Sequence, residues 1–436
     1  MIHSMENIIH RLHDECAGNY EKLSSLIDEN IKPKENDKIV LAEIPTLKEL
    51  RGDMLYTLEN HYWNKTIRIF EPCCGKGGFL VDVYNKLFRG LTSIFIDKKE
   101  RRKNILENCL YFADINQENV EICKKLLDPK NEYNLNFYIG DTLKFDVLSF
   151  WSIKGFDLVI GNPPYNNQTG TGNGTPIWHK FVKISLNSWL IPEGHLLFVH
   201  PPGWRKPCYS RSQFQGLYKL MCHSNHMKIL SIHNVKDGLK SFKCSTRYDY
   251  YLIQKMKNLH QNETIVNDED SNHKNYPMYN LSWFPNKNID WILNIITKDG
   301  EKCKVFCNSK YHAMNKQKIS DVRDENFQYP LIHSTPKSGI RYKYSNYNDK
   351  GHFGISKVIF GESGIHHVVI DMEGKYGLTQ GAIGIIVRDI VQAQGLQKAL
   401  MSEKFKKLLD RTLFGNFRID WRLFTHFNEN FYLDFI

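Results

Sequence analysis

The chain has 436 residues, of which 41% are hydrophobic, so it is long enough to form two domains with buried cores. No apolar run approaches the roughly 20 residues of a membrane-spanning helix, and charges interrupt the N-terminal segment, so we expect no membrane attachment and no signal peptide. The ten cysteines contain no CxxC pair. This usage predicts no metal site and a reducing location, the cytoplasm of a cell or of an infected host.

The net charge of +10 is unevenly distributed along the chain. Residues 1–150 contain 21 basic and 24 acidic residues, whereas residues 151–436 contain 37 and 24. In the second part basic and aromatic residues alternate, as in residues 204–206 (WRK) and 341–344 (RYKY). This pattern is typical of a protein that binds a polyanion through its second half. A basic surface that only confers solubility is the alternative.

A regular alternation of strands and helices follows an N-terminal extension, residues 1–44, which is expected to be helical and peripheral. We predict strands at residues 66–70, 110–114, 136–139, 156–160 and 195–200, and helices at residues 80–87, 118–127 and 176–190. Successive strands joined by helices predict an α/β fold with a Rossmann-like, doubly wound parallel sheet. Its ligands are expected at the carboxyl ends of the strands. This domain is expected to span residues 45–257.

The composition changes after residue 257. The polar, acidic stretch 258–273 is expected to be a linker or loop. Short β-like runs at residues 355–360 and 368–370 and a helix at residues 396–413 follow. We therefore expect residues 258–436 to form a second, α+β recognition domain.

A glycine-rich turn, residues 71–79 (EPCCGKGGF), lies between the first predicted strand and its helix. Such a turn allows close backbone approach and presents helix N-terminal N–H groups to a ligand. Asp114 and Asp141 end the next two strands, where one carboxylate can hold ribose hydroxyls and the other can accept from an adenine amino group. Asp97 lies nearer the usual spacing for a ribose carboxylate. Asp114 is preferred because a helix follows it directly, which makes residues 98–108 an inserted helix; a helix N-cap is the alternative role for either aspartate.

The most informative motif is Gly161-Asn162-Pro163-Pro164-Tyr165-Asn166, which follows the buried strand 156–160. Two consecutive prolines end the strand, because neither has an N–H group to donate. Asn162 offers an amide oxygen, the proline carbonyls are free to accept, and Tyr165 offers a flat apolar face. These groups suit a planar heterocycle that carries an amino group. A proline-stiffened turn with no further role is the alternative.

Together these motifs resemble the amino-methyltransferase family that modifies adenine N6 in DNA. The glycine turn resembles motif I of this family, and residues 112–116 (FADIN) resemble motif II. Residues 140–143 (GDTL) resemble motif III, and residues 162–165 (NPPY) resemble motif IV. The motifs follow one another in the order of the gamma class. The resemblance implies a methyltransferase catalytic domain followed by a target-recognition domain, with S-adenosylmethionine as cofactor. By analogy it places at the cofactor Thr46, Glu71, Pro72, Cys73, Cys74, Gly75, Gly77, Asp114, Ile115, Asp141 and Thr142.

The resemblance also implies a mechanism. The Asn162 side-chain oxygen and the Pro163 carbonyl would accept both hydrogens of the target amino group, while Pro164 stiffens the turn and Tyr165 stacks on the base. Because a paired base cannot reach such a pocket, the target would be flipped out of duplex DNA. A second stacking aromatic is expected among Tyr248, Tyr250 and Tyr251, and the polar loop 166–174 is expected to order over DNA. The expected DNA contacts are Trp204, Arg205, Lys206, Arg341 and Lys343.

The expected partners are double-stranded DNA and, in addition, a separately encoded restriction endonuclease. The motif also occurs in enzymes that methylate guanine N2 in RNA or glutamine in proteins, so an RNA or protein substrate is the main alternative. The long basic region that follows the motif favours DNA. Cytosine N4 as the target and a non-catalytic nucleic-acid-binding protein are the remaining alternatives.

Overall fold

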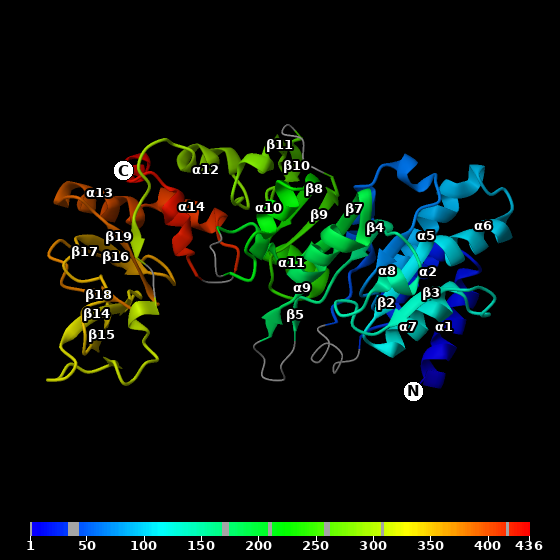
Figure 1. The fold of residues 1–436 in the computed structure, drawn as a ribbon, viewed down its shortest axis with the longest axis horizontal. Helices are drawn as coiled ribbons and strands as arrows, with labels where there is room; N and C mark the ends of the chain where they lie inside the picture. Colours follow the sequence, from blue (N-terminus) through cyan, green and yellow to red (C-terminus); the bar gives the residue numbers. More distant parts are fainter. Residues whose placement is uncertain are drawn as a thin grey trace. The chain divides into compact units, whose positions relative to one another are not determined.

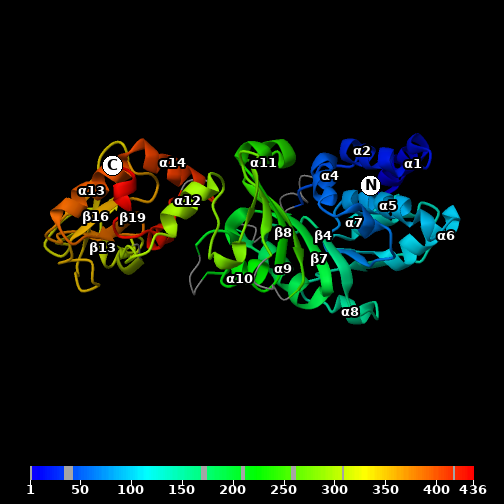
Figure 2. The ribbon, with the colours of Figure 1, turned by 90° about the horizontal axis from the view of Figure 1, so that it is seen from above.

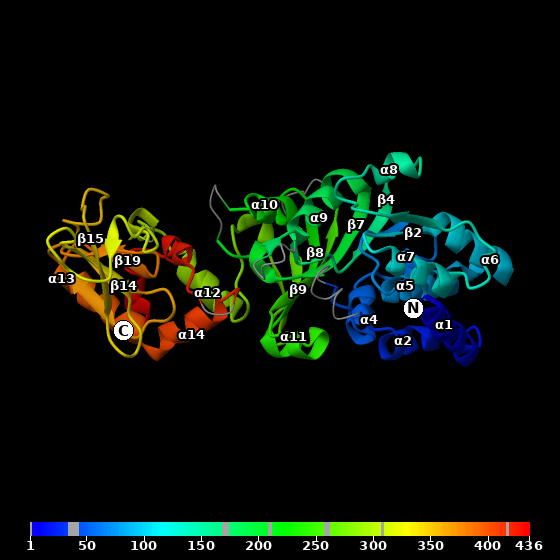
Figure 3. The ribbon, with the colours of Figure 1, turned by 90° about the horizontal axis from the view of Figure 1, so that it is seen from below.

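The computed structural model describes residues 2–33, 43–167, 174–207, 212–256, 262–306, 309–415 and 418–436. By internal contacts the chain divides into two units. Unit 1 comprises residues 1–204 and 213–282, and unit 2 comprises residues 205–212 and 283–436. The ribbon in Figure 1 is coloured along the sequence, and Figures 2 and 3 show it from above and below.

Unit 1 is built on a mixed sheet with the described strand order β11-β10-β8-β9-β7-β4-β1-β2-β3. The strands are β1 (Ile69–Glu71), β2 (Leu110–Asp114), β3 (Asn136–Ile139), β4 (Phe156–Gly161), β7 (Leu190–His200), β8 (His226–His233), β9 (Tyr248–Gln254), β10 (Thr264–Asn267) and β11 (His273–Tyr276). Strands β3, β2, β1, β4 and β7 are parallel to one another, whereas β9 runs antiparallel between β7 and β8. Strand β10 is parallel to β8, and β11 runs antiparallel to β10. The predicted α/β fold is confirmed, with the reversed strands β9 and β11 making the sheet mixed.

Helices cover the sheet (Figure 1), and several of them begin where the sequence supplies a cap or a sharp turn. Helix α5 (Gly78–Gly90) follows Gly77, whose φ of 80° lies in the left-handed region that favours glycine. Asn116 caps α7 (Gln117–Leu127) by accepting from Glu118 N. The other helices of unit 1 are α4 (Lys48–Tyr56), α6 (Lys98–Asn104), α8 (Val147–Phe150), α9 (Trp178–Ile184), α10 (Leu217–Cys222) and α11 (Val235–Phe242).

The N-terminal helices are part of the core of unit 1 rather than a separate appendage. Helices α1 (Ile2–Cys16) and α2 (Tyr20–Asn30) bury Leu12 and Leu23 in the same apolar cluster as α5 and α7. Their burial stabilises both the helices and the sheet.

Two sequence expectations about element boundaries differ from the structure. The stretch 258–273, expected as a linker, contributes β10 and the start of β11, and the contact division falls after residue 282 rather than at residue 257. The predicted helix 396–413 is two helices, α13 (Ile390–Met401) and α14 (Glu403–Arg411). Ser402 separates them because its hydroxyl accepts from Phe405 N and caps α14.

Unit 2 contains two small sheets packed with α12 (Ile289–Ile296), α13 and α14. One sheet has the order β12 (Val305–Phe306), β19 (Ala382–Ile386), β16 (Lys357–Gly361) and β17 (Val368–Asp371). The other has the order β13 (Ile319–Ser320), β15 (Arg341–Ser345), β14 (Tyr329–Ser334) and β18 (Gly377–Leu378). Among the residues described in both units, we find no helix long and apolar enough to cross a membrane.

Candidate active site

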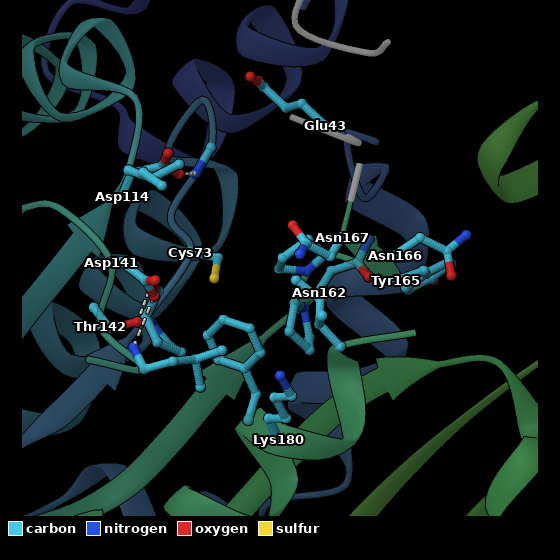
Figure 4. A pocket seen from close by; sticks show the side chains of 18 of the residues that line it. Glu43, Cys73, Asp114, Asp141, Thr142, Asn162, Tyr165, Asn166, Asn167 and Lys180 are labelled. Carbon is cyan, nitrogen blue, oxygen red and sulfur yellow. Dashed lines mark hydrogen bonds between the residues drawn. The ribbon is translucent and has the colours of Figure 1, made fainter. Parts of the chain in front are cut away.

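A cavity of about 470 Å³ lies in unit 1 at the carboxyl ends of β1, β2, β3 and β4 (Figure 4). A smaller cavity of about 80 Å³ adjoins it and shares Glu43, Cys73, Gly75 and Asn162. The structure brings most of the predicted cofactor and catalytic residues to these two cavities. The larger is lined by Pro72, Cys73, Gly75, Asp114, Ile115, Asp141, Thr142, Asn162, Pro163, Pro164 and Tyr165, and the smaller by Thr46, Glu71 and Cys74 among others.

The glycine turn is tied to the end of β2. Asp114 Oδ2 accepts from Gly75 N over 2.9 Å, and its Oδ1 accepts from Asn116 N over 2.8 Å. Burial raises the pKa of this carboxyl, and the two N–H donors act in the opposite direction. Gly77 lies beneath the turn, where a Cβ atom would stand 3.0 Å from Cys123 Sγ. The turn and Asp114 therefore form one wall of the cavity.

The competing ribose candidate, Asp97, is a helix cap. Its side chain accepts from Lys99 N and Glu100 N at the start of α6. The predicted inserted helix is present as α6 and the π-helical turn Ile105–Cys109 that follows it. Asp97 therefore satisfies helix N–H groups, whereas Asp114 faces the cavity with Asp141 (Figure 4).

Asp141 and Thr142 follow β3. Asp141 Oδ1 accepts from Leu143 N over 3.1 Å, and its Oδ2 lies 3.0 Å from Lys144 Nζ. The Thr142 hydroxyl donates to Pro72 O over 3.5 Å and ties this loop to the glycine turn. These bonds hold the loops after β1 and β3 side by side at the cavity.

Asn162 has a side-chain amide whose orientation follows from its partners. Its Nδ2 donates to Ile44 O over 3.2 Å and to Thr46 Oγ1 over 3.1 Å. A carbonyl oxygen can only accept, so the nitrogen of the amide must face Ile44. The Oδ1 atom is buried and has no hydrogen-bond partner among the described residues. A buried acceptor without a partner costs free energy, which a ligand that donates a hydrogen would recover.

Tyr165 follows the two prolines with its hydroxyl buried and without a partner in the described part of the chain. Burial raises the pKa of this hydroxyl, so it stays protonated. Its ring meets Phe242 edge-on, with centroids 6.5 Å apart. Phe242 is the last residue of α11, six positions before β9, and the sequence reading missed it.

The three tyrosines expected to supply a second stacking ring have other contacts. Tyr248 stacks on His233 with centroids 4.4 Å apart, and Tyr250 also stacks on His233. The Tyr251 ring is fully buried, and its hydroxyl lies 2.7 Å from His200 Nε2. Phe242 therefore contacts the ring of the motif tyrosine, although it is not among the residues that line the cavity.

Lys76, an unusual residue for such a glycine turn, does not point into the cavity as a free charge. Its Nζ donates to Asn119 Oδ1 over 2.6 Å and lies 3.4 Å from Glu43 Oε1. Glu43 is a further cavity residue that the sequence reading did not identify, since it lies in the segment before the sheet. Burial raises the pKa of the Glu43 carboxyl, and the nearby Lys76 acts in the opposite direction.

The acidic residue of the turn, Glu71, is fully buried at the end of β1. Burial raises the pKa of its carboxyl well above the ordinary value, with Arg51 acting in the opposite direction. Its Oε2 has no partner among the described residues. The cavities therefore present buried carboxyl groups from Glu43, Glu71 and Asp114, whose oxygens can accept hydrogen bonds from a ligand.

The expected nucleic-acid contacts have different environments. Trp204 is 1% exposed and its Nε1 donates to Asp249, while Arg205 is 0% exposed and donates to Phe284 O, Pro285 O and Asn286 Oδ1. Neither side chain is therefore at the surface, because each is needed to satisfy buried polar groups inside its own unit. Lys206 is half-buried, Lys343 is paired with Asp321, and Arg341 is exposed.

Two further expectations concern loops and metals. The expected loop 166–174 begins with the hairpin strand β5 (Asn166–Asn167) and ends directly before its partner β6 (Thr175–Pro176), but residues 168–173 lie outside the described residues. A search of the described residues finds no group of three or more His, Cys, Asp or Glu side chains that could hold a metal ion.

Part of this chain, which includes several of the site residues, matches a known protein family. Residues 96–242 match the family described as Eco57I restriction-modification methylase. The match covers less than half of the chain, and it makes this region similar to a restriction-modification methylase. It contains Asp114, Asp141, the NPPY motif and Phe242, so the resemblance inferred from the motifs is confirmed there. S-adenosylmethionine is the methyl donor used by methyltransferases of this fold.

The chain is also similar to a curated protein and to solved structures. A tRNA1(Val) (adenine(37)-N6)-methyltransferase from Glaesserella parasuis serovar 5 (strain SH0165) is 30% identical over 86 residues, which are 18% of this chain and 37% of that protein. The DrdV–DNA complex covers 94% of this chain and 58% of its own, at 10% identity and a TM-score of 0.52. The type IIL restriction-modification enzyme MmeI in complex with DNA covers 92% and 70%, at 11% identity and a TM-score of 0.49. The chain thus spans about a third of the curated relative and just over half of DrdV.

Proposed function

We propose that this protein transfers a methyl group from S-adenosylmethionine to adenine N6 of a base flipped out of duplex DNA. The observation that carries the proposal is Asn162: its amide nitrogen is fully engaged, and its buried oxygen lines the cavity without a partner. An exocyclic amino group is the complementary donor.

The cavities fit the proposed cofactor. Asp114 can accept from ribose hydroxyls and Asp141 from an adenine amino group, while the Glu71 carboxyl, whose Oε2 has no partner among the described residues, can accept a hydrogen bond from the amino group of the methionine end. The glycine turn lets a ligand approach the backbone closely. The larger cavity has a volume of about 470 Å³, which is that of an ordinary small-molecule site. When bound, S-adenosylmethionine supplies an electrophilic methyl group on a sulfonium.

The chain's own residues then act on the target base. An adenine amino nitrogen is a poor nucleophile because its lone pair is delocalised into the ring. Asn162 Oδ1 and the Pro163 carbonyl accept its two hydrogens, which favours tetrahedral geometry at nitrogen and localises the lone pair. Positioning and electrostatic complementarity supply most of the acceleration. Tyr165 and Phe242 provide the aromatic surface against which the flipped base packs.

Duplex DNA is the substrate that the charge distribution favours. Residues 151–436 contain 37 basic and 24 acidic residues, and exposed Arg341 lies on β15 of unit 2. The relatives also include structures determined with DNA, DrdV and MmeI. We further propose that a separately encoded restriction endonuclease is the functional partner of this methylation.

RNA is the second candidate substrate, because the curated relative is a tRNA adenine-N6 methyltransferase. The test is transfer of tritiated methyl groups from S-adenosylmethionine to duplex DNA, to structured RNA and to protein, followed by nucleoside analysis. N6-methyldeoxyadenosine is the expected product. Label in RNA alone would replace the DNA proposal with the RNA one.

A further inference from the structure

The N-terminal segment that precedes the sheet contacts the catalytic motif directly. Ile44 O and Thr46 Oγ1 accept the two hydrogens of Asn162 Nδ2. Thr46 is buried and lines the smaller cavity, whereas the larger cavity, which holds Asp114 and Asp141, does not include it. The hydroxyl of Thr46 thus faces the catalytic amide.

These two bonds affect the amide in two ways. They fix its rotation, so that Oδ1 points away from Ile44 and Thr46. They also polarise the amide, because hydrogen bonds from its N–H groups shift electron density toward its oxygen. Both effects make Oδ1 a better acceptor for an incoming amino group.

Thr46 is itself held by a buried ion-pair network. Arg51 Nη1 donates to Thr46 O and lies 2.8 Å from Asp28 Oδ1 on α2, while Arg51 Nε lies 2.6 Å from Asp82 Oδ2 on α5. Ser24 Oγ accepts a further bond from this guanidinium over 3.0 Å. Arg51 is 2% exposed, so solvent does not compete for these bonds. The planar guanidinium therefore locks the backbone of Thr46 to two helices of the core.

We propose that Thr46 is a positioning residue for methyl transfer: it orients and polarises the Asn162 amide, and Arg51 fixes Thr46. The inference rests on the proposed function and gives Thr46 a role beyond the cofactor contact suggested by its sequence. Ile44 and Thr46 thereby complete a catalytic motif that lies more than a hundred residues later in the chain.

The test compares Thr46→Val with Thr46→Ser. Valine keeps the shape of threonine but leaves an Asn162 N–H without its acceptor, whereas serine keeps the hydroxyl. Three quantities are measured for each variant: the single-turnover rate of methyl transfer to DNA, the Kd for S-adenosylhomocysteine by calorimetry, and the thermal midpoint.

We expect Thr46→Val to slow transfer about ten- to a hundredfold, as for one lost hydrogen bond in a buried site. The Kd for S-adenosylhomocysteine should change less than about threefold, and Thr46→Ser should recover most of the rate. A Thr46→Val protein with normal transfer would overturn the inference, as would a weakened Kd that alone accounts for the loss. A wild-type protein that methylates no substrate would instead contradict the proposed function.

Discussion

Asn162 Nδ2 donates to Thr46 Oγ1 over 3.1 Å, although 116 residues separate the two positions. The relationship explains why the N-terminal helices and the sheet share one core: α2 and α4 carry the residues that anchor Thr46, and β4 delivers Asn162. Removing the segment before the sheet would therefore remove part of the catalytic site as well as part of the core.

Because Tyr165 is expected to stack on the base, two substitutions of this residue should differ in their effect on the KM for DNA. Because the hydroxyl has no described partner, Tyr165→Phe should leave the KM for DNA within about twofold. Tyr165→Ala removes the stacking surface and should raise the KM about tenfold or more, since base–aromatic stacking is worth about 1–3 kcal/mol. Steady-state kinetics of both variants on one duplex make the comparison.

Phe242 is expected to act with Tyr165, because its ring packs edge-on against this cavity-lining tyrosine. Phe242→Leu, which keeps apolar volume, should raise the KM for DNA less than Tyr165→Ala does and leave cofactor affinity unchanged. Equal kinetics for wild type and Phe242→Leu would show that this ring does not contact the base.

The cofactor assignment predicts that Asp114→Asn weakens binding of S-adenosylhomocysteine by about tenfold or more, because a carboxylate that accepts from hydroxyls becomes a neutral amide. Asp97→Asn is the matched control, since Asp97 caps α6 and asparagine is an equally good cap. Calorimetric titration of both proteins gives the Kd values. A larger loss for Asp97→Asn would contradict the assignment.

Much of unit 1 could be predicted from the sequence because its strands are short, apolar and followed by helix caps. Strands β2 and β3 have the expected bounds, and Asn162 follows β4 as expected. The pairing of β9 between β7 and β8 could not be predicted, because strand direction depends on long-range contacts that local periodicity does not encode.

The predicted site was incomplete for the same physical reason. Thr46 was placed at the site only by a loose resemblance, and Glu43 and Arg51 were not placed there at all, since nothing near them in sequence shows that they meet the NPPY motif. Trp204 and Arg205 show the opposite error: a tryptophan and an arginine beside each other resemble a nucleic-acid contact, yet both are buried. A sequence pattern shows which groups are present but not which of them are needed to satisfy the core.

The salt dependence of DNA binding separates an exposed cation from a buried side chain. Exposed Arg341→Ala should weaken binding to duplex DNA and reduce the slope of log K against log salt by about one, as expected for one lost phosphate contact. Trp204→Phe should instead lower the thermal midpoint, since it removes a buried hydrogen bond to Asp249, and leave the slope unchanged. Fluorescence anisotropy at several salt concentrations measures both.

Acid should destabilise the protein through His200. Its Nδ1 lies 2.9 Å from Pro201 O and its Nε2 lies 2.7 Å from the Tyr251 hydroxyl, and burial lowers the pKa of His200 to about 3. Below about pH 6.5 the unfolded chain binds a proton at this histidine that the folded chain does not. Stability is therefore lost as the pH falls from about 6.5 toward 3, by at most about 1.4 kcal/mol per pH unit for this group.

Urea denaturation midpoints between pH 7.5 and pH 4.5 check this dependence. His200→Phe should flatten it, even if the variant is less stable at neutral pH. His61→Gln is the control, because the His61 side chain is 74% exposed. A pH dependence that His200→Phe leaves unchanged would show that other groups determine the acid sensitivity.

The most direct test of the central claim is transfer of tritiated methyl groups to duplex DNA by wild type and by Asn162→Ala, with nucleoside analysis of the product and calorimetry of S-adenosylhomocysteine binding. We predict N6-methyldeoxyadenosine with the wild type, a rate at least about a thousandfold lower with Asn162→Ala, and similar cofactor affinity for both proteins. Equal transfer by the two proteins, or no label in DNA from a wild type that binds the cofactor, would contradict the account.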